Sequence, residues 1–287
     1  MPDERLTKND KREAAREQAR LAREKQQRRE RLRRWLIPTG VTVVVLAIVA
    51  IVVLVVSTSA PAPQTAKGPK NMLSDGIVLT GSSGKMVATP TAAIKAKGTP
   101  TATSYDQSDG LAHIVTYVDF SCPICQEFET ANEDNIQQLV EDGKATLEVH
   151  PIAILDRNFL GSRYSSRATN VAACVANFAP NDFYAVMEGM YAGQGTEQTT
   201  GLTNQQMIKI VHEAGLKNGD VDSCINGESF KSWVTASTAR ALAGPLPNTS
   251  VTAVTGTPTV LVNGQQYQGS FTDANAFVTF IGQVLAG

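Results

Sequence analysis

The 287-residue sequence contains few of the residues that usually hold metals or nucleotides. It has three histidines, which lie far apart, and four cysteines, of which two are close together. A zinc site needs four ligands, usually as two Cys or His pairs at short spacing, and the chain offers one such pair. No glycine-rich segment has the spacing of a phosphate-binding loop ahead of a helix. The sequence therefore predicts no bound metal and no cofactor.

Basic residues are also scarce over most of the chain. The first 35 residues carry 13 Lys or Arg and 7 Asp or Glu, whereas the remaining residues carry 13 basic and 20 acidic ones. A nucleic-acid-binding protein usually concentrates basic residues on its folded part. The acidic excess after residue 35 therefore argues against nucleic-acid binding. Residues 1–34 lack an apolar face, and we expect them to form a solvated, partly helical cytoplasmic tail.

Charge is absent altogether from Trp35 to Ala60. This run is long enough to cross a hydrocarbon layer of about 30 Å as a helix. Its basic flank lies on the N-terminal side, which predicts a cell-membrane anchor with a cytoplasmic N-terminus. A cleavable signal peptide ending at Thr58-Ser59-Ala60 is the alternative. Its charged leader would be unusually long, so we favour an uncleaved single-pass anchor.

The chain beyond the anchor divides into a tether and one domain. Residues 61–75 form a Pro/Ala/Ser linker by composition, which is typical of a flexible tether. Residues 76–287 then form an extracytoplasmic domain of ordinary size.

The closely spaced pair, Cys122 and Cys125, organises this domain. An apolar run over residues 114–118 precedes the pair, and apolar residues at helical spacing follow it, so we expect a strand that leads into a helix over residues 122–141. Cys122 would lie on the first turn, where free N–H groups and the helix dipole favour a thiolate. Pro123 suits this turn because its missing N–H costs little there. Residues three apart on a helix are neighbours, so the two cysteines can form a disulfide.

Two other roles for this pair agree less well with the sequence. The pair could supply half of the ligands of a zinc site, but the sequence offers no second pair of ligands. It could also form an inert structural disulfide, but such a bond usually joins segments that are distant in sequence. We therefore interpret Cys122 as the nucleophile and Cys125 as the resolving cysteine of a redox-active dithiol.

The other two cysteines, Cys174 and Cys224, are expected to form a structural disulfide. Outside the cytoplasm nothing keeps thiols reduced, so four cysteines predict two disulfides at rest. Since Cys122 and Cys125 form one pair, the remaining two form the other. Closing a loop of about 50 residues stabilises a protein by roughly 4 kcal/mol.

Periodicity predicts a mixed α/β order for the domain. A strand is expected over residues 76–80, then a turn-rich segment, then strands and helices in alternation. The expected strands cover residues 113–120, 145–155, 258–262 and 266–269, and the expected helices cover residues 122–141, 166–179, 182–191, 204–214, 221–225, 228–242 and 273–285.

Two motifs give this order a family resemblance. They are Asp-Phe-Ser-Cys-Pro-Ile-Cys at residues 119–125 and Thr-Gly-Thr-Pro-Thr-Val at residues 255–260. With a helical block over about residues 160–243, the chain resembles DsbA, and more narrowly the membrane-anchored DsbA-like thiol:disulfide oxidoreductases of Gram-positive and actinobacterial type. The resemblance covers about residues 110–287. It implies a thioredoxin-like α/β fold with an inserted helical subdomain, preceded by a single transmembrane helix.

The resemblance also implies roles for individual residues. The bond between Thr257 and Pro258 should be cis, and Thr257 should lie against the sulfur atoms. Pro123 and Ile124 between the cysteines should tune the dithiol. Strongly oxidising relatives often carry His where this chain has Ile124, so Cys122 is expected to depend on the helix terminus and local backbone alone. Asp119 is a candidate proton acceptor, and a carboxylate facing solvent is the alternative.

The expected function is that of a membrane-tethered oxidase that introduces disulfides into exported proteins by thiol–disulfide exchange. A reductase or isomerase of the same fold is one alternative, and a binding module with an inert dithiol is another. The expected partners are exported proteins that contain cysteine and, by the resemblance, a quinone-linked membrane thiol oxidase that restores the disulfide.

Overall fold

The computed structural model describes residues 67–287, so the expected cytoplasmic tail and the Trp35–Ala60 anchor lie outside the described residues. Within residues 67–287, no helix is both long and apolar enough to cross a membrane. The strands are β1 (Ile77–Ser82), β2 (Lys85–Ala88), β3 (Ala112–Val118), β4 (Ala145–Pro151), β5 (Thr259–Val262) and β6 (Gln265–Gln266). The α-helices are α2 (Pro123–Glu141), α3 (Tyr164–Phe178), α4 (Phe183–Ala192), α5 (Asn204–Glu213), α6 (Gly219–Asn226), α7 (Lys231–Ala243) and α8 (Ala274–Ala286), and short 3₁₀ helices span Asp156–Asn158 and Pro180–Asp182.

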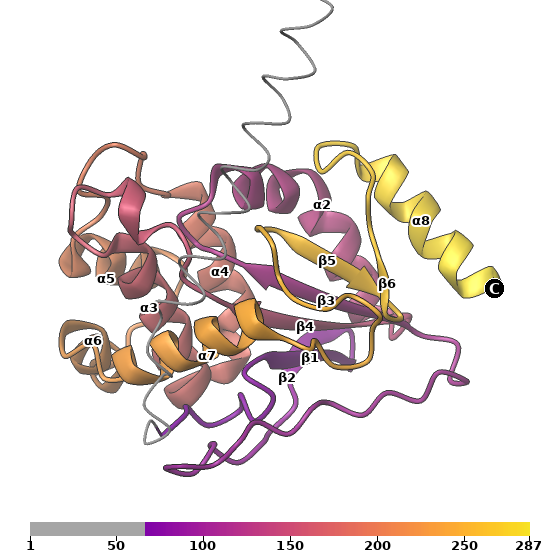
Figure 1. Cartoon of the computed structure of the whole chain (residues 1–287), viewed down its shortest axis with the longest axis horizontal. Helices are drawn as coiled ribbons and strands as arrows, with labels where there is room; N and C mark the ends of the chain where they lie inside the picture. The colour runs from indigo at the N-terminus through magenta and orange to yellow at the C-terminus, as the bar shows by residue number, and fades with distance from the viewer. Residues whose placement is uncertain (1–66) are drawn as a thin grey trace, which may run out of the picture. The chain divides into compact units, whose positions relative to one another are not determined.

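The strands form one mixed sheet in the order β2-β1-β4-β3-β5-β6 (Figure 1). The pairing of β3 with β4 is parallel, and the other four pairings are antiparallel. The α2 crossover makes the parallel pairing possible, because two parallel neighbours need a long connection. β3 lies between β4 and β5, so the end of β3 that feeds α2 is central in the sheet.

Alternate residues of the strands build separate cores on the two faces of the sheet. Ile114 and Val118 of β3 belong to a large core that also contains Phe128 and Ile136 of α2. Tyr117 of β3 instead packs with the C-terminal end of α7 and with the loop that follows it. This division follows from the two-residue period of a strand, which turns successive side chains to opposite faces.

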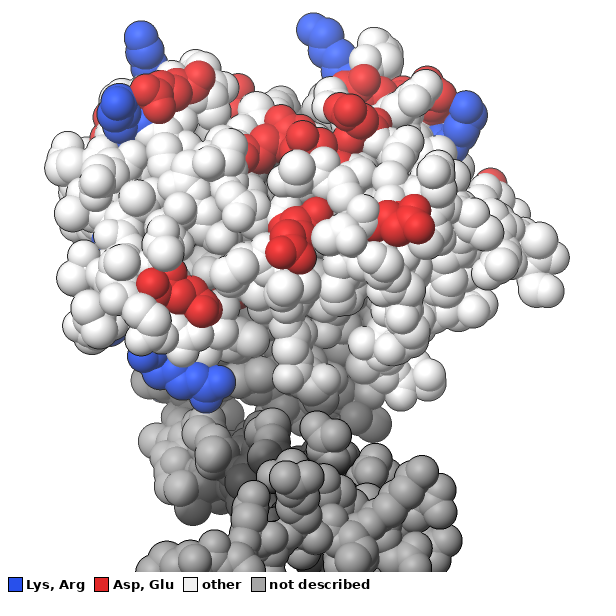
Figure 2. All heavy atoms as spheres, turned by 90° about the horizontal axis from the view of Figure 1, so that it is seen from above, with Lys and Arg blue, Asp and Glu red and all other residues white. Residues whose placement is uncertain are grey.

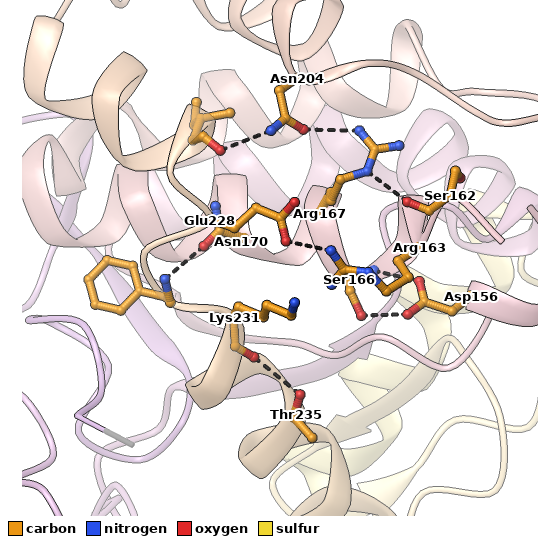
Figure 3. A network of polar contacts seen from close by, with 12 residues as sticks. Asp156, Ser162, Arg163, Ser166, Arg167, Asn170, Asn204, Glu228, Lys231 and Thr235 are labelled. Carbon is orange, nitrogen blue, oxygen red and sulfur yellow. Dashed lines mark hydrogen bonds and ion pairs between the residues drawn. The ribbon is translucent and has the colours of Figure 1, made fainter. Parts of the chain in front are cut away.

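The helical block between β4 and β5 is held together by a disulfide and a polar network. Cys174 of α3 is bonded to Cys224 of α6, as the pairing argument expected. Arg163, just before α3, pairs with Glu228 at 2.8 Å, and Arg167 donates to Asn204 at 3.0 Å (Figure 3). These contacts join the start of α3 to α5 and to the α6–α7 connection, so the insertion forms a single packed unit.

Two expectations about the N-terminal part of the domain were wrong. Residues 67–75 are not part of a tether, because Met72 is fully buried and Asp75 makes an ion pair with Arg240 at 2.6 Å. Part of the expected turn-rich segment is a strand, β2, which pairs with β1 across Ser83 and Gly84. Both turn residues have positive φ, a backbone that suits a two-residue hairpin turn.

Elsewhere the predicted elements agree with the structure apart from their ends. The strand expected over residues 145–155 stops at Pro151, and the helix expected over residues 228–242 begins at Lys231. Thr203 caps α5 through a reciprocal capping box with Gln206, as its sequence suggests.

Candidate active site

The two free cysteines of the described chain lie at the start of α2, directly after the central strand β3. Cys122 is the N-cap residue of α2, with an extended backbone (φ −85°, ψ 120°), and Pro123 occupies the first turn. The expected helix therefore begins one residue later than predicted. Cys122 is 6% exposed and Cys125 is fully buried, so Cys122 is the sulfur that a partner can reach.

The environment of Cys122 stabilises a thiolate. Its pKa is lowered to about 6, mainly by a hydrogen bond from the Cys125 thiol, with further contributions from Thr257 and the backbone N–H groups of Cys125 and Ile124. These N–H groups are free because they belong to the first turn of the helix, where no preceding carbonyl can accept from them. The expectation that Cys122 depends on helix terminus and backbone alone is therefore wrong, since two side chains also contribute.

Cys125 has the opposite character. Burial raises the pKa of its thiol well above the ordinary value, and the adjacent Cys122 raises it further. At neutral pH the dithiol therefore consists of a thiolate at Cys122 and a thiol at Cys125, which donates a hydrogen bond to it. The two sulfurs, three residues apart, therefore differ in protonation state, and only Cys122 is a thiolate ready to act as a nucleophile or leaving group.

The loop before β5 faces the dithiol from across the site. The Thr257–Pro258 peptide bond is cis, and the carbonyl oxygen of Thr257 lies 3.3 Å from the Cys122 sulfur, where it accepts a hydrogen bond from the thiol form of Cys122. The hydroxyl of Thr257 is buried and has no hydrogen-bond partner within the described residues, and its side chain helps to lower the pKa of Cys122. Cys122 and this loop are 135 residues apart in sequence, and the pairing of β3 with β5 brings them together.

Asp119, three residues before Cys122, is fully buried, so the alternative of a carboxylate facing solvent is wrong. One of its oxygens accepts from the backbone N–H and hydroxyl of Ser121, at 2.9 and 2.7 Å. The other accepts from the Ser165 hydroxyl at 2.6 Å and from two backbone N–H groups, of Ile154 at 2.8 Å and Leu155 at 3.2 Å. Burial raises the pKa of Asp119, and these hydrogen bonds oppose the rise. The carboxyl group thus joins the dithiol loop, the segment after β4 and α3.

Sequence reasoning missed two glutamines that support the site. Gln194, after α4, donates to the carbonyl oxygens of Phe120 at 2.9 Å and Cys122 at 3.1 Å. Gln126 of α2 donates to the carbonyl oxygen of Tyr191 at 2.6 Å. These three bonds fasten the dithiol loop and the start of α2 to α4 and the residues after it. No local signal could have revealed them, because the partners are more than 60 residues apart.

The side chains of Ile124, His113 and His150 make no hydrogen bond to the Cys122 thiolate. Ile124 is 41% exposed beside Cys122 and offers the thiolate only its backbone N–H. His113 and His150 are buried strand residues, and His150 stacks on Tyr117. Across residues 67–287, no group of His, Cys, Asp and Glu side chains has an arrangement that could hold a metal ion.

Comparisons with known proteins agree with this geometry. The thioredoxin family model matches residues 98–281, which is well over half of the chain. The chain belongs to the thioredoxin family. A search of curated proteins found no match. Among solved structures, the reduced form of the disulfide bond oxidoreductase DsbG from Mycobacterium tuberculosis is similar at 27% identity and a TM-score of 0.52, over 74% of this chain and 88% of that one.

Two further solved structures are similar to this thioredoxin-family protein. Reduced DsbA from Mycobacterium tuberculosis is 27% identical, with a TM-score of 0.52, over 74% of this chain and 93% of that one. BdbD from Bacillus subtilis shares the fold at 16% identity, with a TM-score of 0.52, over 78% of this chain and 99% of that one. Together with the dithiol, these findings identify a DsbA-like thiol:disulfide oxidoreductase rather than an inert binding module.

Proposed function

We propose that this oxidoreductase introduces disulfides into exported proteins through Cys122 and Cys125. The observation that carries the proposal is the lowered pKa of Cys122, about 6. A thiol of low pKa is a good leaving group and a stable thiolate, so the reduced dithiol is favoured and the disulfide form is an oxidant. The raised pKa of Cys125 keeps the second sulfur protonated after it has been released.

The reaction proceeds by two exchanges. A substrate thiolate attacks the Cys122 sulfur of the oxidised protein, the Cys122–Cys125 bond breaks, and Cys125 leaves and takes up a proton. A second substrate thiolate then attacks the substrate sulfur of this mixed disulfide, and Cys122 leaves as a thiolate. Two electrons pass from the substrate to the protein, which ends in the reduced form.

The cis-Pro258 loop provides the place for the substrate chain. Proline has no N–H, so the backbone beside Pro258 is open to pairing with an extended polypeptide. The short distance between Thr257 and Cys122 would bring the cysteine of such a segment to the reactive sulfur.

We further propose that the protein acts at the outer face of the cell membrane, held there by Trp35–Ala60 with residues 1–34 in the cytoplasm. The support is the uncharged run and its basic N-terminal flank. By family resemblance, a quinone-linked membrane thiol oxidase would accept the two electrons from the reduced dithiol. Protease digestion of intact, wall-stripped cells would test the orientation, since the domain should be cleaved and the tail protected.

The decisive measurement is the reduction potential of the Cys122–Cys125 pair by equilibration with glutathione. A variant with Cys174→Ser and Cys224→Ser serves as the control, so that only one dithiol titrates. An oxidase should give about −120 to −180 mV. A value below about −240 mV would contradict the oxidase and favour a reductase, the alternative supported by Ile124 in place of a hydrogen-bond donor.

A further inference from the structure

The seam between α2 and α4 carries acidic side chains and no basic one. The two helices contain six Asp or Glu and no Lys or Arg. Glu133 lies where α2 meets α4, since the Tyr184 hydroxyl of α4 donates to the carbonyl oxygen of Glu133 at 3.1 Å. Burial and then the charges of acidic neighbours, Asp134 for Glu133 and both α2 residues for Glu188, raise the pKa of Glu133 and Glu188. On the side of the molecule where α2 lies, acidic side chains occupy the middle of the surface and basic ones lie at its margins (Figure 2).

A buried carboxyl group lies in the same seam without a counter-charge. Glu129 is 3% exposed, and no Lys, Arg or His of residues 67–287 forms an ion pair with it. Its pKa is raised to about 8 by burial first and then by Glu133 and Glu188, with no hydrogen bond acting against the rise. Glu129 is therefore protonated at neutral pH, and a positive group brought into the seam would favour its ionisation, because a nearby opposite charge stabilises a carboxylate.

This seam leads directly away from the reactive sulfur. Cys122, Gln126, Glu129 and Glu133 follow one another at spacings of four, three and four, which places them along one face of the helix. The hydrogen bond from Gln126 to Tyr191 shows that this face meets α4. At 1.5 Å per residue, Glu129 lies about 10 Å and Glu133 about 16 Å along α2 from Cys122. An extended polypeptide covers these distances in about three to five residues.

We propose that the acidic seam, formed by the accessible Glu133, Asp134 and Glu188 beside the buried Glu129, binds Lys or Arg side chains of the substrate polypeptide about three to five residues from the cysteine that reacts with Cys122. The inference rests on the proposed function, because it needs a polypeptide substrate at the dithiol. A bound metal ion fits the seam less well, since the described chain contains no group of three ligands able to hold one. An anionic lipid surface would be repelled by the same charges.

The test compares exchange rates for three cysteine peptides that differ only at positions three to five from the cysteine, on both sides, where they carry Lys, Gln or Glu. With the oxidised protein at low salt, the Lys peptide should react about tenfold faster than the Gln peptide, and the Glu peptide should react most slowly. The rate advantage of the Lys peptide should largely disappear at about 1 M NaCl, because salt then screens interactions between charges beyond about 3 Å. The Glu133→Gln/Asp134→Asn/Glu188→Gln variant should lose the preference and keep the Gln-peptide rate.

A matched control removes three acidic charges elsewhere, with Glu213→Gln, Asp220→Asn and Asp222→Asn on α5 and α6. This variant should retain the preference, which separates a local seam from the effect of net charge. Equal rates for the three peptides would overturn the inference while leaving thiol–disulfide exchange intact. Millimolar CaCl₂ and NaCl are also compared at the same ionic strength. If CaCl₂ abolishes the preference for the Lys peptide and NaCl does not, the seam is a divalent-ion site and the inference is overturned. Absence of exchange with every peptide would refute the proposed function as well.

Discussion

Cys122 and Cys125 differ in acidity because the structure treats the two sulfurs differently. Cys122 accepts hydrogen bonds from the Cys125 thiol and from the free N–H groups of the first helical turn, whereas Cys125 is buried and meets the charge of its neighbour. A hydrogen bond to the charged form lowers a thiol pKa, and desolvation raises it. The direction of the exchange reaction therefore depends on contacts within one turn of α2 and on Thr257.

The hydroxyl of Thr257 can be tested on its own. We expect Thr257→Val to raise the pKa of Cys122 by roughly 0.5 to 1 unit, because the Thr257 side chain stabilises the thiolate and its hydroxyl makes no other hydrogen bond within the described residues. The pH dependence of thiolate ultraviolet absorbance measures this shift. Thr116→Val is the control, since it also removes a buried hydroxyl without a partner but lies within β3. An unchanged Cys122 pKa in Thr257→Val would remove Thr257 from the list of causes.

Glu129 should make the stability of the protein depend on pH. Its pKa in the folded protein is about 8, above the ordinary 4.5, so the folded state binds this proton more tightly than the unfolded chain does. The resulting stability is complete below about pH 4.5 and is lost as the pH rises through 8. The ionisable groups that face it are Glu133 on its own helix and Tyr184, Glu188 and Tyr191 on α4.

We therefore expect Glu129→Gln to have little effect in acid and to raise the free energy of unfolding by roughly 1 to 4 kcal/mol above pH 8. Urea denaturation at a series of pH values measures the difference. Glu127→Gln, an exposed residue of the same helix, should change stability by less than about 0.5 kcal/mol at every pH. A constant difference for Glu129→Gln across the pH range would show that folding does not shift the pKa of Glu129.

At the scale of the elements, α3 connects the catalytic loop to the inserted helices. Ser165 near its start binds Asp119 beside the dithiol, and Cys174 further along is bonded to α6. Arg163 and Arg167 add contacts to the α6–α7 connection and to α5. Helix α3 therefore contacts both the inserted helices and the loop that carries Cys122, and it fixes the position of one relative to the other.

The Cys174–Cys224 disulfide should matter for stability and little for exchange. It closes a loop of 50 residues, so replacing both cysteines by serine should lower the free energy of unfolding by roughly 4 kcal/mol. Guanidinium denaturation measures the loss, and the rate of exchange with a cysteine peptide under native conditions should change by less than about twofold, because Asp119 and Gln194 still hold the loop. A large loss of exchange in a folded variant would instead assign a redox role to this pair.

At the scale of the whole described domain, residues 67–75 act as a clamp between the sheet and the helical block. Asp75 accepts two hydrogen bonds from Arg240, at 2.6 and 2.8 Å, and a third from the indole of Trp233 at 3.0 Å. Lys70 and Asn71 bind to the end of α3 on the same block. The segment just before β1 therefore belongs to the folded domain.

Two shortened proteins test this clamp. A chain that begins at Lys67 should fold with the full stability of the domain, whereas a chain that begins at Gly76 should lose roughly 2 to 5 kcal/mol. The loss follows from removing fully buried Met72 and leaving Trp233 and Arg240 without their partner. Thermal unfolding compares the two, and equal midpoints would show that the segment adds nothing to stability.

The sequence by itself determined the features that depend on neighbours along the chain. Cys122 and Cys125 at a strand–helix junction, the helical block and the two strands expected over residues 258–262 and 266–269 could be predicted because helix periodicity, strand patterning and cysteine spacing are local properties. The second motif around Pro258 needed the family resemblance, since nothing local assigns a cis bond to it.

Only the tertiary structure decided how these pieces act on one another. In the folded protein Asp119 is buried and not exposed, Thr257 lies beside the Cys122 sulfur, and Gln194 holds the dithiol loop by hydrogen bonds. The tertiary structure also paired the four-residue β2 with β1 and gave Glu129 its acidic neighbours. Each of these outcomes depends on contacts between residues that are distant in sequence or on burial by the assembled core, and neither quantity exists until the sheet and the inserted helices have packed together.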